Sequence, residues 1–263
     1  MATLKKVAYL GDGSVTGAAA YLAGVLTHFD IPYDRVDSDR APSENFWKTD
    51  YAAYLFSDYP AEYLRAEDFQ TLLQKVHAGA GLVMLGGWES FHGRLGEYHQ
   101  TPLAEALPVK MLAEDDRRNV SQPLLVVPTA KHENHPILQG LPWNTPPGIG
   151  GFNAFLPKET SETVLEGVRF QVDYRQNQFT FQMKERIPLL VTGKYGNGRT
   201  AALATDVAPH WVGGWVDWGK NRIVQDVPGG DFIDVGEDYA RFFRNLVLWG
   251  NPILMINEII INH

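Results

Sequence analysis

The sequence contains no cysteine, and this absence removes several kinds of chemistry at once. Disulfides, thiolate metal sites and thiol nucleophiles all need that residue. Lysine and arginine number 23 against 31 aspartates and glutamates, with no basic run, so we expect no nucleic-acid partner. The apolar stretches are only strand-sized, far short of the about 20 residues of a membrane helix. A signal-peptide core is also missing after Met1, and we expect a cytoplasmic protein without membrane contact.

Strand-like and helical segments alternate in the first half of the chain. With 263 residues, 44% of them apolar, the chain can bury a substantial core, and we expect one domain over 1–263. Apolar runs at 7–10, 33–36, 52–56 and 82–85 predict strands, while helical spacing predicts helices after Ser14 and at 66–78. This alternation is typical of a parallel sheet with helices on both faces. We therefore predict an α/β fold with a flavodoxin-like doubly wound, mainly parallel sheet.

The second half is less regular. Residues 109–151 are polar and contain one predicted strand at 124–127. Segments 187–192 and 199–205 flank an Asn-Gly pair, Asn197-Gly198, which predicts a β-hairpin. An amphipathic helix is expected over 237–249, stopped by Gly250. The fold should thus end with a C-terminal β-hairpin and helix.

The segment Leu85-Gly86-Gly87-Trp88-Glu89-Ser90 places polar side chains at the end of a buried strand. In open α/β sheets this edge is where ligands bind. Paired glycines allow the tight turn that presents a nucleophile in elbow motifs. A plain glycine turn, with Ser90 capping the next helix, is the alternative.

Asp206 and His210 follow a later strand within one loop. If Ser90, His210 and Asp206 converged, they would supply the nucleophile, base and orienting carboxylate of a serine hydrolase. Glu89 with Asp206 would instead pair two carboxylates for acid/base work or for binding sugar hydroxyls. Structural or solvated roles for these side chains remain the alternatives.

Tryptophans and histidines add further candidates. Trp211 and Trp215 lie in a glycine-containing loop that either stacks on a ligand or packs on the core or a subunit interface. His92 with His99, and His132 with His135, lack a clear third ligand, so we expect no metal.

Two other segments have unremarkable interpretations. The turn Gly11-Asp12-Gly13-Ser14 has Thr16 where a dinucleotide motif needs its last glycine, and we expect no cofactor. The run Asp115-Asp116-Arg117-Arg118 is interpreted as an intrachain ion pair or a solvated run, with a functional charged loop as the alternative.

Taken together, these motifs resemble those of a bacterial family of putative glutamine amidotransferases. The matching segments, in order, are Gly86-Gly87-Trp88-Glu89-Ser90-Phe91, Gly96-Glu97-Tyr98, Thr101-Pro102-Leu103, Leu107-Pro108-Val109, Asp115-Asp116-Arg117, His135-Pro136-Ile137, Gly151-Phe152-Asn153, Gly196-x-Gly198-Arg199 and Thr205-Asp206 with Pro209-His210-Trp211. The resemblance implies the class I glutamine amidotransferase-like fold, which trehalose-utilisation-type proteins share.

The chain departs from the glutaminases of that class at the catalytic positions. Those enzymes carry cysteine at the elbow and, later, a His and a Glu two residues apart. Here Trp88, Glu89 or Ser90 stands at the elbow, and no His-x-Glu follows. Cysteine-dependent glutaminase activity is therefore excluded.

Three functions remain open at this stage. The first is binding of a small polar metabolite, such as a carbohydrate, in a cleft at the strand ends. The second is a hydrolase using Ser90 or Glu89 with His210 and Asp206, and the third is a non-catalytic oligomeric interaction module. The largely apolar tail 253–263 either adds a strand to the chain's own sheet or pairs with another subunit, and together with the tryptophan loop it favours a homo-oligomer. The residues expected to bind ligand are Gly87, Trp88, His92, Asn153, Trp211 and Trp215.

Overall fold

Five parallel strands form one half of the central sheet. The computed structural model describes residues 5–250. The parallel strands stand in the order β2-β1-β3-β4-β11, which matches the flavodoxin-like prediction. Every residue of β1, β3 and β4 is buried, and nearly all are apolar, because both faces of this half are covered. The strand bounds are β1 Val7–Gly11, β2 Tyr33–Val36, β3 Ala53–Ser57, β4 Gly81–Leu85 and β11 Gly198–Leu203.

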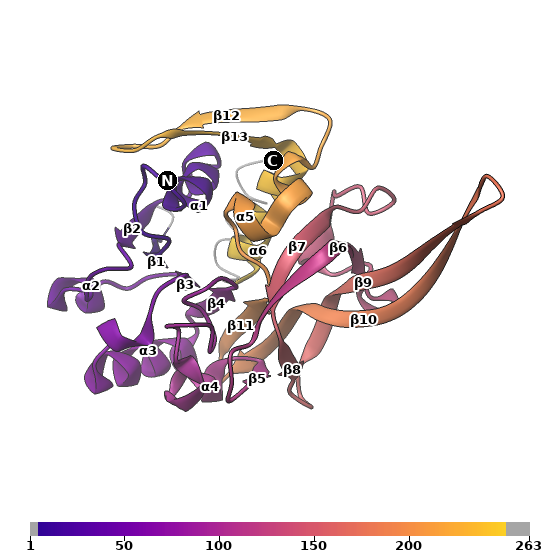
Figure 1. Ribbon diagram of the computed structural model, residues 1–263. Coiled ribbons are helices and arrows are strands. Elements are labelled where there is room, and N and C mark those ends of the chain that lie inside the picture. Colours follow the sequence, from indigo (N-terminus) through magenta and orange to yellow (C-terminus); the bar gives the residue numbers. More distant parts are fainter. Residues whose placement is uncertain (1–4, 251–263) are drawn as a thin grey trace.

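Helices cover this parallel half on both sides (Figure 1). On one side α1 (Ala19–His28) contacts α6 (Glu237–Gly250), and α6 also lies against β3, β4 and β11. On the other side lie α2 (Glu44–Lys48), α3 (Ala66–Ala78) and α4 (Leu103–Ala106), where α3 contacts both α2 and α4. The predicted apolar stripe of α6 is buried, which confirms the C-terminal helix.

Four antiparallel strands continue the sheet in the order β10-β9-β6-β7. Strand β10 pairs with β11 across a two-residue loop, Gly196-Asn197, so the predicted hairpin is confirmed. The turn lies one residue earlier than the Asn-Gly pair suggested, because Gly198 already pairs with Tyr195. The bounds are β6 Arg117–Pro128, β7 Gly148–Asn153, β9 Glu162–Arg175 and β10 Gln178–Tyr195.

Smaller elements complete the fold. Strands β5 (Val109–Met111) and β8 (Phe155–Pro157) form one small sheet. Strands β12 (Arg222–Asp226) and β13 (Phe232–Gly236) form another, which packs against α1. The short helix α5 (Pro209–Val212) follows β11. Among residues 5–250, no helix is both long and apolar enough to cross a membrane.

The outer parts of β9 and β10 extend away from the rest of the molecule as a two-stranded ribbon (Figure 1). We use "the ribbon" for residues 170–183. Its register pairs Tyr174 with Phe179 and Val172 with Phe181, across the turn residues Gln176 and Asn177. The largely apolar tail for which a strand is expected, 253–263, lies outside the described residues.

Candidate functional site

Three aspartates converge at the C-terminal edge of the parallel strands. Asp12 directly follows β1, Asp58 directly follows β3, and Asp206 lies shortly after β11. One carboxylate oxygen from each lies within 4.8 Å of the others, and we call this group the acidic edge. Asp12 and Asp206 are buried, whereas Asp58 is partly exposed. Strands β1 and β3 also flank the point where the strand order reverses, which is where open α/β sheets bind ligands.

The paired glycines after β4 make room for this convergence. Strand β4 lies between β3 and β11, so a side chain at its end would stand between Asp58 and Asp206. A Cβ atom at Gly87 would lie 2.0 Å from Asp58 Oδ1, and one at Gly86 would lie 2.1 Å from the carbonyl oxygen of Ala204. The φ of Gly87 is +155°, a conformation that side chains disfavour. Glycine is therefore required here by space for the Asp58 carboxylate.

Each aspartate of the acidic edge accepts hydrogen bonds from its surroundings. The Tyr9 hydroxyl donates to Asp12 Oδ2 at 2.5 Å. The amide of Glu89 donates to Asp58 Oδ1, and the amide of Ala208 donates to Asp206 Oδ1, both at 2.8 Å. Asp12 Oδ1 is buried and makes no short hydrogen bond among the described residues. The Ser57 side chain lies close enough to lower the pKa of Asp12.

Burial changes the protonation of this group. It raises the pKa of Asp12 to about 8, and the negative charge of Asp206 adds to the effect. Burial also raises the pKa of Asp58 well above its ordinary value, with further contributions from Asp206 and Asp12. At neutral pH the acidic edge therefore holds protons, because three carboxylates this close, two of them buried, do not all ionise.

His210 is hydrogen-bonded to the acidic edge. Its Nδ1 lies 3.0 Å from Asp206 Oδ2, and this hydrogen bond raises the pKa of His210 above its ordinary value. The histidine side chain is 49% exposed, so the pair reaches the protein surface. The structure thus brings together two residues that the sequence nominated, Asp206 and His210.

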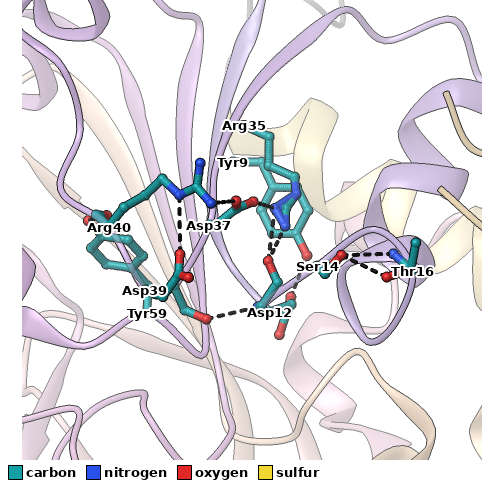
Figure 2. A network of polar contacts seen from close by, with 11 residues as sticks. Tyr9, Asp12, Ser14, Thr16, Arg35, Asp37, Asp39, Arg40 and Tyr59 are labelled. Carbon is teal, nitrogen blue, oxygen red and sulfur yellow. Dashed lines mark hydrogen bonds and ion pairs between the residues drawn. The ribbon is translucent and has the colours of Figure 1, made fainter. Parts of the chain in front are cut away.

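A shell of polar contacts fixes the turn that carries Asp12 (Figure 2). The Arg35 guanidinium donates to the carbonyl oxygen of Gly13, pairs with Asp37 and lies 5.7 Å from the Tyr9 ring centroid. The amide of Gly13 donates to Ser38 Oγ at 2.8 Å. This turn was interpreted as a plain connection, so sequence reasoning missed Asp12, and it missed Asp58 as well. The signal was available, since both aspartates directly follow buried strands at the same edge.

The residues after the glycine pair have different surroundings. Ser90 is buried, and its Oγ accepts a hydrogen bond from the amide of Asp58 at 3.0 Å. Among residues 5–250, no hydrogen bond joins Ser90 to His210. Burial raises the pKa of the Glu89 carboxyl group, with a smaller contribution from Glu62.

Trp88 is the exposed aromatic residue beside the acidic edge. Its side chain is 43% exposed, and its ring meets that of His210 edge-on with centroids 6.1 Å apart. The guanidinium of Arg117 lies over the Trp88 ring at 4.9 Å. The structure therefore brings Trp88, and not Ser90, to His210.

Asn153 and Asp116 form hydrogen bonds to the backbone of the segment that follows β4. The Asn153 side chain accepts from the amide of Gly87 at 2.8 Å and donates to the carbonyl oxygen of Gly87 at 3.0 Å. It also donates to Asp116 Oδ1, and the Asp116 carboxylate accepts the amides of His92 and Gly93. Asp116 is fully buried, which corrects its interpretation as part of a solvated loop, although Asp115 does pair with a neighbouring arginine.

The tryptophan loop packs on the protein itself. Trp211 is 2% exposed, and its Nε1 donates to Asn119 Oδ1. Trp215 is fully buried and contacts the rings of Phe242 and Phe243. Of the two interpretations of this loop, packing on the core is therefore the one observed, and the expected stacking surface is not formed by Trp211 or Trp215.

More than half of the chain matches the model of one known protein family. Residues 57–227 match the model of the GATase1_like family, described as putative glutamine amidotransferase. The chain belongs to this family. The matched range includes Asp58 and Asp206, whereas Asp12 lies before it. No curated protein matches the chain.

Two solved structures share the fold over almost the whole chain. The first is Cytoplasmic Protein STM1381 from Salmonella typhimurium LT2, with 25% identity, a TM-score of 0.69, and coverage of 94% of this chain and 99% of that one. The second is Cytoplasmic Protein STM3548 from Salmonella typhimurium, with 22% identity, a TM-score of 0.68 and the same coverage. The likeness confirms the glutamine amidotransferase-like fold.

Two groups of side chains among the described residues of this GATase1_like chain could hold a metal ion. The first is the acidic edge, and the second contains two histidines. His92 Nδ1 and His99 Nδ1 lie 3.0 Å apart, and Glu97 Oε2 lies 3.7 Å from His99 Nδ1. Glu97 is the third donor that the sequence spacing did not reveal. A single N–H···N hydrogen bond between the two rings accounts for the same geometry.

Two cavities of this family member lie away from the acidic edge. One of about 410 Å³ is lined by residues between Asp34 and Tyr51. One of about 840 Å³ is lined by residues around Pro147, Trp218 and Arg241. Neither includes an aspartate of the acidic edge. We base the candidate site on the acidic edge, because clustered buried carboxylates cost free energy that a merely hollow surface does not.

Proposed function

We propose that the chain is a non-glutaminase member of the GATase1_like family that binds a small hydroxyl-rich metabolite, of the carbohydrate class, at the acidic edge. The observation that carries the proposal is the convergence of Asp12, Asp58 and Asp206 from three strand ends. Buried carboxylates with raised pKa values are characteristic of binding and catalytic sites, because a fold gains no stability from placing them together.

The protonation of the acidic edge at neutral pH favours a ligand with hydroxyl groups. Raised pKa values at Asp12 and Asp58 mean that the acidic edge offers both O–H donors and carboxylate acceptors at neutral pH. A hydroxyl group also donates and accepts at once, so vicinal hydroxyls match such a mixed set. The exposed ring of Trp88 adds an apolar face of the kind that packs on a sugar ring.

A hydrolase function has less support. Asp206 holds His210 in the manner of an orienting carboxylate, which favours a general base at this position. The Ser90 hydroxyl is buried against the amide of Asp58 and therefore receives no catalytic role in the proposal. We further propose a cytoplasmic location, supported by the two similar Salmonella proteins, which are both described as cytoplasmic.

Thermal shift and calorimetric titration test the binding proposal. A panel of mono- and disaccharides, polyols and chloride salts of Mg²⁺, Ca²⁺ and Mn²⁺ should contain a hydroxyl-rich compound that raises the Tm, since a ligand of the native state stabilises it. The Asp206→Asn variant should bind that compound at least 10-fold more weakly. Asp50→Asn is the matched control, because Asp50 is exposed and precedes β3 at the opposite edge of the sheet.

The panel also separates the alternatives. Stabilisation by a divalent cation alone, lost in Asp206→Asn, would replace the hydroxyl-rich ligand with a metal site. A sugar that binds wild type and Asp206→Asn equally would place its site away from the acidic edge and refute the proposal.

A further inference from the structure

The ribbon carries an apolar face that nothing in the described protomer covers. Along each strand, alternate residues point to opposite faces. The cross-strand pairs Tyr174–Phe179, Val172–Phe181 and Phe170–Met183 therefore form three rows on one face. The adjacent rings contact each other, with centroids 4.6 Å apart for Tyr174 and Phe179 and 5.9 Å apart for Phe170 and Phe181.

The opposite face of the ribbon is polar. Its cross-strand pairs are Arg175–Gln178, Asp173–Thr180 and Gln171–Gln182. Gln171 donates to the Asp173 carboxylate on this face. A two-stranded ribbon with one apolar and one polar face is the pattern of a sheet that buries one side. Here the apolar side is exposed instead, with Phe181 69% and Phe179 64% accessible.

We propose that the apolar face of the ribbon is a homodimer interface, in which it packs against the same face of a second copy of this chain. A ribbon of two strands is marginal on its own, and burial of its apolar face in a partner would stabilise it. Exposed apolar patches of a few hundred Å² mark interaction sites on soluble proteins.

The area of the face suits a two-fold pairing. Aromatic side chains bury about 150–250 Å² each, so the three exposed aromatics with Val172 and Met183, each about half exposed, offer on the order of 600 Å² per copy. Two copies would bury about 1,200 Å², the lower end of the range for stable interfaces, before neighbouring surfaces contribute.

The lack of charged residues on the apolar face of the ribbon also favours a second copy over a charged partner. The chain carries a net charge of −8, which opposes self-association in general. The three rows of the face contain no ionisable group that is charged at neutral pH, so pairing two copies here brings no like charges together. The charged residues Asp173 and Arg175 lie on the polar face and would stay in solvent. Two-fold symmetric pairing of one patch with itself is the commonest form of assembly.

Light scattering of the full chain at micromolar concentration tests the proposal. Wild type should have twice the 29.4 kDa mass of one chain, and Phe179→Ser/Phe181→Ser should have the mass of one chain. The matched control, Thr180→Ser/Gln182→Ser, alters the polar face of the same ribbon and should stay dimeric. Unchanged circular dichroism in all three proteins establishes that the fold is intact.

The absence of cysteine permits a second, independent test. Val172→Cys introduces a single thiol in the middle row and keeps the three exposed aromatics, and a bismaleimide with a span of about 10 Å, the spacing of stacked sheets, should link it to its symmetry mate. Thr180→Cys on the polar face should remain uncrosslinked.

Four outcomes would overturn the proposal. They are a monomeric wild type, a dimer that survives Phe179→Ser/Phe181→Ser, a dimer lost on deletion of 253–263 but not on ribbon substitution, and equal crosslinking from both faces. A monomer that binds phosphatidylcholine or phosphatidylglycerol vesicles through Phe181 would assign the face to a lipid surface instead.

Discussion

The acidic edge and the ribbon depart in opposite ways from the usual separation of polar and apolar side chains. At the acidic edge, Asp12 and Asp206 are buried beside a third carboxylate, at the C-terminal edge of the parallel half of the sheet. On the ribbon, Phe179 and Phe181 are exposed at the far end of the antiparallel half. Burying carboxylates lowers the stability of the isolated protomer. Exposing aromatic side chains does not strain the fold, but the protomer lacks the stabilisation that their burial would give.

The comparison indicates how each region should respond to substitution. Side chains at the acidic edge are fixed by close contacts, so changes there should alter the free energy of unfolding. Side chains on the ribbon contact few neighbours, so changes there should alter association and leave unfolding of the protomer almost unchanged. Natural folds tolerate such departures mainly where the chain binds something.

Gly87→Ala should have the largest effect. The new methyl group would meet the Asp58 carboxylate at 2.0 Å and would impose a φ of +155° on alanine. Together these should lower the free energy of unfolding by about 2–4 kcal/mol, measured by urea denaturation. Gly214→Ala is the control, because its nearest neighbour atom would be 3.9 Å away.

A double variant shows which part of that loss comes from the acidic edge. Asp58→Ala removes the atoms that a Cβ at residue 87 would meet. Gly87→Ala should therefore cost at least about 1 kcal/mol less in the Asp58→Ala background than in wild type. An equal cost in both backgrounds would attribute the loss to backbone strain alone.

Asp12→Asn should have an intermediate and pH-dependent effect. The pKa of Asp12 is about 8 in the folded protein, whereas an unfolded aspartate has a pKa of about 3.9. Between pH 5 and 8 the unfolded state therefore binds fewer protons than the folded state, so stability falls as the pH rises. Wild type should lose on the order of 3–4 kcal/mol more than Asp12→Asn across this window, in urea denaturation at both pH values.

An exposed carboxylate provides the control for the pH series. Asp50 pairs with Lys5 at the surface, and this hydrogen bond lowers its pKa, so it stays ionised above pH 5 in both states. Asp50→Asn should therefore follow the pH dependence of wild type between pH 5 and 8. If Asp12→Asn follows it too, Asp12 is ionised in the folded protein and the acidic edge does not hold the protons assigned to it.

The sequence predicted the parallel half of the fold better than the antiparallel half. Strands buried on both faces appear as short apolar runs, such as 82–85, and these stand out. In the ribbon, Phe170, Val172 and Tyr174 alternate with polar residues, which is an equally regular period of two. That alternation was passed over because the surrounding stretch is polar. The hairpin turn was placed one residue late because an Asn-Gly pair is a strong but local signal.

The sequence predicted Asp206 and His210 of the candidate site but not Asp12 and Asp58, again because local patterns are easier to recognise than distant ones. Asp206 and His210 stand in one loop, and their pairing at 3.0 Å needs only local geometry. Asp12 and Asp58 are far from Asp206 in the sequence, and their convergence depends on the order of the strands. A lone aspartate after a strand resembles a turn residue. The glycine pair was interpreted through the residues that follow it, whereas its contact with Asp58 becomes visible only when β3 and β4 lie side by side.

Phe181→Ser should have the smallest effect on the protomer, and it tests the comparison most directly. The Phe181 side chain is 69% exposed, so its loss should change the free energy of unfolding by less than about 0.5 kcal/mol when wild type is measured at nanomolar concentration, where dimers dissociate. Phe56→Ser, at 1% exposure in β3, is matched in chemistry and should cost about 3–5 kcal/mol. At micromolar concentration the wild type should gain apparent stability over Phe181→Ser, because association favours the folded state. A Phe181→Ser variant as destabilised as Phe56→Ser at nanomolar concentration would mean that the ribbon is covered within its own protomer, and the contrast between the two regions would disappear.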